Sequence, residues 1–168
     1  RECGIWLTLK HPNITPFLGW ALKISNVIHA HIFTELAVNH SIARFIKSHP
    51  DANMKKLLRD SAEGIEYLHA EGIIHGDIKP TNILVNSDLR AVLCDFGLAR
   101  RIGDPQTDPQ DDSVNTTHQY SAPELLLGIS LEPPVRTEAT DVWAFGCTGL
   151  EVRGFKGSWI VNLSLFFS

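Results

Sequence analysis

The sequence predicts an α+β domain that is mostly helical, with a few strands near its N-terminal end. Two segments rich in β-branched and aromatic residues, 14–22 and 26–33, favour strands. Segment 51–70 carries apolar residues at a helical period, and 140–152 is a mostly apolar stretch typical of a buried helix. The chain has 168 residues, 43% of them hydrophobic, which is enough for one domain with a core.

The ends of these elements also have local signals. Residues 2–9 are expected to be the end of a helix. This helix stops at His11-Pro12, because proline cannot continue a helix. Asp51 is a candidate N-cap for the long helix, and Gly72 stands where a C-terminal cap belongs.

Downstream of the long helix, the chain alternates between short regular segments and polar loops. Residues 83–85 and 91–94 are expected to form a short hairpin around a turn at 86–88. Residues 101–116 are rich in Asp, Gln, Pro and Thr, which is typical of a loop.

Charge and cysteine content exclude some functions. A net charge of −4 gives no sign of nucleic-acid binding. The three cysteines are an odd number and widely spaced, which favours reduced thiols in a cytoplasmic or nuclear protein and speaks against a zinc site. The apolar residues 160–167 are too few for a membrane span. The sequence leaves the oligomeric state unknown.

The segment His75-Gly76-Asp77-Ile78-Lys79-Pro80-Thr81-Asn82 places a carboxylate, an amine and an amide within six residues. Asp95-Phe96-Gly97 begins 18 residues after Asp77, and Ala122-Pro123-Glu124 follows. The order and spacing of these motifs resemble the catalytic core of a eukaryotic protein kinase. Alone, Asp77 would be interpreted as a turn residue before Pro80; the agreement of several motifs favours a catalytic role.

The resemblance implies a role for each residue of this loop. Asp77 would orient the substrate hydroxyl and accept its proton, and Lys79 would contact the γ-phosphate of ATP. Asn82 and Asp95 would hold magnesium. Thr117 would bridge Asp77 and Lys79. Lys79 favours Ser/Thr over Tyr specificity, so the implied partner is a protein substrate and the nearest pattern is the tyrosine-kinase-like group.

The resemblance also implies a nucleotide site. Glu2 would match the glutamate that pairs with an upstream lysine. Backbone groups of Glu35 and Ala37 would bind adenine, and Thr34 would be the gatekeeper beside them. Leu84 would form the floor under the adenine, a role compatible with that of a core strand residue. The residues expected to stack between the lobes are Trp6, Phe17, His75 and Phe96.

In terms of the family's architecture, residues 1–38 would be a partial N-lobe and hinge, comprising the end of the C-helix and the fourth and fifth strands. Residues 39–152 would be the C-lobe core, and 153–168 an atypical apolar tail. The sequence contains no GxGxxG motif and starts after the position of the strand lysine. We therefore expect a fragment that is inactive by itself. The alternatives are a truncated kinase or pseudokinase acting as an interaction module and, more distantly, a small-molecule phosphotransferase.

Two departures from the family pattern bear on regulation and stability. Gly76 replaces an arginine that usually binds a phosphorylated activation segment, so we expect no dependence on phosphate at Thr107, Ser113 or Thr116. Glu124 is expected to be a buried carboxylate without its usual arginine partner. Asp141, in the segment DVWAFGC, is expected to anchor the backbone of the catalytic loop.

Overall fold

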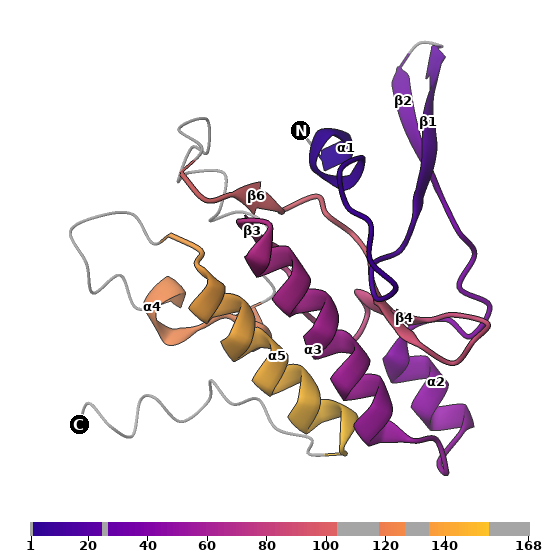
Figure 1. Cartoon of the computed structure of the whole chain (residues 1–168), viewed down its shortest axis with the longest axis vertical. Helices are drawn as coiled ribbons and strands as arrows, with labels where there is room; N and C mark the ends of the chain where they lie inside the picture. The colour runs from indigo at the N-terminus through magenta and orange to yellow at the C-terminus, as the bar shows by residue number, and fades with distance from the viewer. Residues whose placement is uncertain (1, 25–26, 104–117, 127–134, 155–168) are drawn as a thin grey trace.

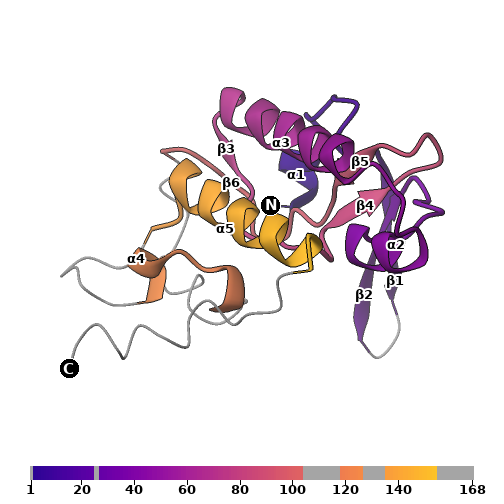
Figure 2. The same cartoon turned by 90° about the horizontal axis from the view of Figure 1, so that it is seen from below.

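The computed structural model describes residues 2–24, 27–103, 118–126 and 135–154. Its centre is a pair of long helices, α3 (Met54–Ala70) and α5 (Glu138–Val152), which lie side by side (Figures 1 and 2). The short helix α1 (Glu2–Trp6) and a ribbon of two strands lie at one end, and α2 (Ile42–Ser48) lies at the other end of α3 (Figure 1).

The ribbon consists of β1 (Phe17–Ile24) and β2 (Ile28–Thr34), paired antiparallel with an irregularity between Phe17 and Gly19. Both strands were predicted, but the sequence places the first of them three residues too early. The physical reason is that Pro16 has no backbone N–H to donate. Residues 14 and 15 pair with Leu93 instead of with the second strand: Ile14 forms a parallel bridge to Leu93, and Thr15 N donates to Leu93 O at 2.9 Å.

One face of the ribbon is apolar and exposed. The register pairs Trp20 with Ile32 and Ile24 with Ile28, so these side chains share a face. Trp20 is 57% exposed and Ile24 is 76% exposed. The ribbon projects away from the helices (Figure 1), which leaves this face uncovered by the part of the chain that the structure describes.

The long helix α3 begins later than predicted. Asn53, not Asp51, is its N-cap, and the Asn53 side chain accepts a hydrogen bond from Lys56 N at 3.0 Å. At the other end, Gly72 follows the C-cap Glu71 with φ +67°, a left-handed conformation that glycine adopts without strain. The prediction of a glycine at this helix end is therefore confirmed.

Two short strand pairs carry the loops of the site. The predicted hairpin is confirmed as β4 (Ile83–Val85) paired with β5 (Ala91–Leu93). A second pair, β3 (Ile73–Ile74) with β6 (Arg100–Arg101), was not predicted, because two residues are too few to show a period.

Helix α5 begins at Glu138, two residues earlier than predicted. It has a capping box, in which Thr137 and Thr140 exchange side-chain and backbone hydrogen bonds. The prediction that α5 is buried is wrong for one side of it, since Val142 is 58% exposed and Trp143 is 46% exposed. Its other side, with Asp141, Ala144 and Thr148, is buried.

The short elements before α5 are the 3-10 turn η2 (His118–Tyr120) and helix α4 (Pro123–Leu126). Tyr120 Oη donates to Glu151 Oε2 at 2.6 Å, which joins η2 to the last turn of α5. The core between α3 and the strand pairs is fully buried at Leu68, Ile73, Ile83, Leu93 and Phe96. None of the helices in the described ranges is long and apolar enough to cross a membrane.

Candidate active site

The segment between β3 and β4 brings three of the predicted residues into direct contact. Lys79 Nζ lies 2.7 Å from Asp77 Oδ2, and Asn82 Nδ2 donates to the same oxygen at 2.8 Å. Asn82 Nδ2 also donates to the backbone carbonyl of Asp77 at 2.9 Å, which closes the loop upon itself. The Asp77 carboxylate is therefore held by a cation and an amide, with its second oxygen left for other partners.

This loop is fixed from below by helix α5. Asp141 is 1% exposed, and its two carboxylate oxygens accept hydrogen bonds from His75 N and Gly76 N, both at 2.9 Å. His69 Nε2 lies 3.0 Å from Asp141 Oδ2 and supplies a third contact. The predicted anchoring role of Asp141 is confirmed, whereas the contribution of His69 was missed because a histidine near a helix end has no distinctive sequence signal.

Asp95 lies next to this cluster, at the end of the β4–β5 hairpin. Cys94 N donates to Asn82 O at 3.0 Å, so the residues before Asp95 pair with the end of the catalytic loop. Asp95 adopts φ +64° and is exposed, while the next residue, Phe96, is fully buried. The turn thus directs a carboxylate outwards and an aromatic ring inwards.

The buried Phe96 ring belongs to a stack of four rings. Trp6 lies 5.0 Å from Phe96 and 5.7 Å from Phe17, and His75 lies 5.2 Å from Phe96 on the other side, between ring centroids. This arrangement matches the stacked column predicted for these four residues. It connects α1 and β1 to the catalytic loop through side chains that are buried or half-buried.

The oxygen atoms of Asn82 and Asp95 suit a hard cation such as magnesium. Because Asn82 Nδ2 donates to Asp77, the other atom of its amide, Oδ1, is an acceptor. Among the described residues, Thr81 Oγ1 donates to this Oδ1 at a long distance of 3.5 Å. The described residues contain no cluster of three or more His, Cys, Asp or Glu that could hold a metal. A magnesium ion here would therefore take most of its ligands from phosphate and water.

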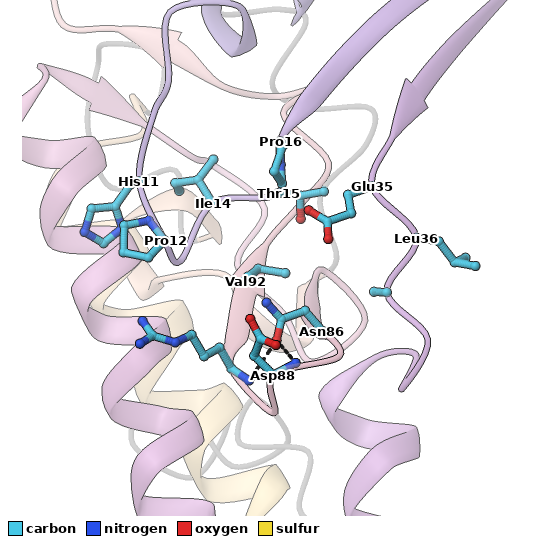
Figure 3. Close-up of a pocket in the computed structure, with 12 residues that line it drawn as sticks. His11, Pro12, Ile14, Thr15, Pro16, Glu35, Leu36, Asn86, Asp88 and Val92 are labelled. Carbon is cyan, nitrogen blue, oxygen red and sulfur yellow. Dashed lines mark hydrogen bonds between the residues drawn. The ribbon is translucent and has the colours of Figure 1, made fainter.

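The connector after β2 lies beside the β4–β5 hairpin. Asn39 N donates to Val85 O, and Ser41 forms an antiparallel bridge to Leu84, so the predicted adenine floor is next to the connector. A hollow of about 400 Å³ opens against Glu35, Leu36 and Ala37 (Figure 3). Leu84 and Asp95 do not line this hollow, so it shares only Glu35 and Ala37 of the connector with the predicted nucleotide site.

The position of Gly76 revealed a residue that the sequence did not indicate. Gly76 has φ +77°, and a Cβ built on it would lie 3.0 Å from Arg136 Cδ and 3.0 Å from Leu98 O. Arg136 is 3% exposed and receives a hydrogen bond on its carbonyl from the Arg100 guanidinium. The side chain of Arg136, which directly precedes the N-cap of α5, thus lies beside the catalytic loop.

We expect Gly76→Ala to lower the free energy of unfolding by about 2–3 kcal/mol. About 1 kcal/mol comes from the left-handed conformation, and the rest from the approach to the Leu98 carbonyl, which cannot move easily. Gly72→Ala is a matched control, because Gly72 has φ +67° but its Cβ would meet no atom within 4 Å. Equal losses in urea unfolding of the two variants would show that the contact at position 76 costs nothing.

The thiol of Cys94 is not suited to be a nucleophile. Burial raises its pKa from 9.0 to about 12, and the nearby Asp95 and Asp77 carboxylates add to the effect. Because the pKa is higher in the folded chain, the stabilisation linked to this thiol is complete below pH 9 and is lost as the pH rises from about 9 towards 12.

At pH 8.5 we expect iodoacetamide to alkylate Cys94 in the folded chain on the order of 10³-fold more slowly than in the chain unfolded in urea, since the thiolate fraction falls in that proportion. Peptide mass spectrometry over time measures both rates. Comparable rates in the two states would contradict the raised pKa.

Several sequence predictions cannot be placed. Glu2 lies in α1, but its side chain is outside the described part of the structure, as are Thr107, Ser113, Thr116, Thr117 and the tail from 155 onwards. The expectation that Glu124 is buried is wrong, since it is exposed in α4, where water solvates the carboxylate.

The α+β fold, the Asp–Lys–Asn loop and the Asp-Phe-Gly turn together define the class of protein kinase domains. A family model described as "Protein kinase domain" matches residues 1–157, so the chain belongs to this family.

Three relatives illustrate the range of similarity. "MAP3K epsilon protein kinase 1" of Brassica napus is 32% identical over 157 residues, covering 90% of this chain and 11% of that protein. "Serine/threonine-protein kinase RUNKEL" of Arabidopsis thaliana is 31% identical over 150 residues, covering 88% and 10%. "Serine/threonine-protein kinase SSN3" of Candida albicans is 35% identical over 165 residues, covering 93% and 26%. The chain spans about a tenth of the first two proteins and about a quarter of the third.

Proposed function

We propose that this chain carries the catalytic loop of a serine/threonine protein kinase, which transfers the γ-phosphoryl group of Mg-ATP to a protein hydroxyl. The observation that carries the proposal is the contact of Lys79 Nζ and Asn82 Nδ2 with one oxygen of Asp77, at 2.7 and 2.8 Å. The names of the relatives support the same class.

Each residue of the loop has a distinct task in this proposal. Asp77 Oδ1 orients the incoming Ser or Thr hydroxyl and accepts its proton as the oxygen attacks phosphorus. Lys79, which contacts Asp77, places a positive charge where charge develops on the transferred group. Asn82 and Asp95 present hard oxygens to the cation. When bound, Mg-ATP supplies the phosphoryl group and the neutralising metal charge.

The binding surfaces follow the same assignment. The backbone of Glu35 and Ala37 would bind the adenine edge, with Leu84 beneath it and Thr34 behind it. Glu2 would pair with an upstream lysine, and Thr117 would bridge Asp77 and Lys79. Residues 1–38 would then be a partial N-lobe with hinge and 39–152 the C-lobe core.

A protein is the favoured substrate because the segment after η2 lies beside the catalytic carboxylate. Asp77, Tyr120 and Ser121 all line one small hollow of about 20 Å³. A peptide chain seated on Tyr120–Glu124 would thus present a hydroxyl to Asp77.

The full natural chain that carries this sequence, incubated with γ-labelled ATP, magnesium and a protein mixture, should label Ser and Thr residues. Peptide mass spectrometry identifies the labelled side chains. Label found only on Tyr, or only on an aminoglycoside, would refute the assignment.

A non-catalytic interaction module is the second candidate. The exposed apolar face of the ribbon, with Trp20 and Ile24, favours it, because soluble proteins rarely expose large contiguous apolar patches without a partner. Absence of any transfer from the full natural chain, with a folded catalytic loop, would favour this reading.

A further inference from the structure

The hollow behind the connector contains a polar atom with no partner. Thr15 is 2% exposed, and its hydroxyl Oγ1 has no hydrogen-bond partner among the described residues. Its backbone is fully engaged, since Thr15 N donates to Leu93 O and Thr15 O accepts from Trp6 Nε1. Buried polar groups are normally hydrogen-bonded, so this hydroxyl is an acceptor that the described residues leave without a donor.

The hollow has the size and mixed lining of a small-molecule site. Its volume is about 400 Å³, within the usual range of ligand pockets of roughly 300–1,000 Å³. Ile14, Val92 and Pro12 supply apolar walls. Thr15, Glu35, Asn86 and Asp88 all line the hollow, and Figure 3 shows their side chains around it.

The charges around the hollow favour a cation. The charged side chains that line it are Glu35, Asp88 and Arg90, two acidic and one basic, so the formal charge of the lining is −1 with His11 neutral. The side-chain acceptor of Asn86 is already committed, since its Oδ1 accepts from the backbone N–H groups of Asp88 and Arg90, both at 3.0 Å. The two carboxylates and the Thr15 hydroxyl are then the groups that can bind a donor.

We propose that this hollow binds a small organic cation, an amine carried on a compact apolar body. The amine would lie between Glu35 and Asp88, and a donor on the ligand would reach Thr15 Oγ1. The apolar body would cover Ile14 and Val92. This site shares only the connector with the proposed nucleotide site and does not depend on it, because Leu84 and Asp95 do not line it.

The test uses three probes with one ring and different charges: benzylamine, benzyl alcohol and benzoate. Each is titrated into the ¹⁵N-labelled chain and followed by two-dimensional NMR. Benzylamine should shift the amides of residues 11, 13–15, 35–37 and 86–92 in a saturable manner, and benzoate should not. Equal binding of benzyl alcohol, preferential binding of benzoate, or no saturable shift at these amides would overturn the proposal.

Two variants locate the interaction. Thr15→Val preserves shape while removing the hydroxyl, and Glu35→Gln removes one charge. Each should weaken benzylamine binding, by about five-fold and about three-fold respectively. Glu71→Gln, an exposed carboxylate at the end of α3, should leave the affinity unchanged. The NMR spectrum of each variant shows directly that it is folded, and unchanged affinity in both pocket variants would refute the site.

Discussion

Asp77→Asn is expected to lower the rate of phosphoryl transfer by about 10²–10⁴-fold in the full natural chain that carries this sequence. The amide has the shape of the carboxylate but cannot accept the proton of the substrate hydroxyl. Lys79 Nζ and Asn82 Nδ2 contact the same oxygen, Asp77 Oδ2, at 2.7 and 2.8 Å. In the variant this position holds either a neutral amide oxygen, which is a weaker acceptor, or an amide nitrogen, which cannot accept from either group. The loss should therefore appear in kcat and not in the Michaelis constant for ATP.

Steady-state kinetics of the purified protein with a peptide substrate measure this loss. Asp51→Asn is the matched control, since Asp51 is an exposed carboxylate in the turn before α3. Urea unfolding of both variants separates a chemical effect from a folding defect. If Asp77→Asn retained more than about a third of the rate while Asp51→Asn was normal, Asp77 would not be the base.

Asp141→Ala is expected to destabilise the chain by about 3–5 kcal/mol. The carboxylate is 1% exposed and accepts from His75 N and Gly76 N, and it also contacts His69 Nε2. Its removal leaves two backbone N–H groups buried without acceptors, each at a cost of about 1–3 kcal/mol, and adds a small cavity.

Equilibrium unfolding in urea measures the change, with Val142→Ala as the control on the exposed side of the same helix. Asp141→Asn should fall between them, because an amide oxygen can still accept from one of the two N–H groups. A loss below about 1 kcal/mol for Asp141→Ala would mean that other groups or water hold the catalytic loop.

The sequence was most informative where several motifs constrained one another. The loop from His75 to Asn82, the β4–β5 hairpin and the anchoring Asp141 were predicted and lie as expected. The ring contacts of Phe96 with Trp6 and His75 agree with the column that the resemblance to protein kinases implied.

Other features depended on long-range packing that no local pattern reveals. Arg136 fills the space beside Gly76 only because α5 and the catalytic loop meet in three dimensions. Thr15 looks like an ordinary strand residue, and only the fold shows that its hydroxyl is buried. The exposed side of α5 was misjudged because apolar composition predicts burial on average, whereas the position of each neighbour decides it for a given residue.

The bond between Asp141 and the loop at His75 spans 66 residues of chain. During synthesis at about 5–20 residues per second, the loop therefore leaves the ribosome several seconds before its anchor exists. In that interval His75 N and Gly76 N lack the acceptor that Asp141 provides in the folded chain. The catalytic loop therefore reaches its final geometry only after α5 has been synthesised and Asp141 has bound the loop, and not when the loop itself is synthesised.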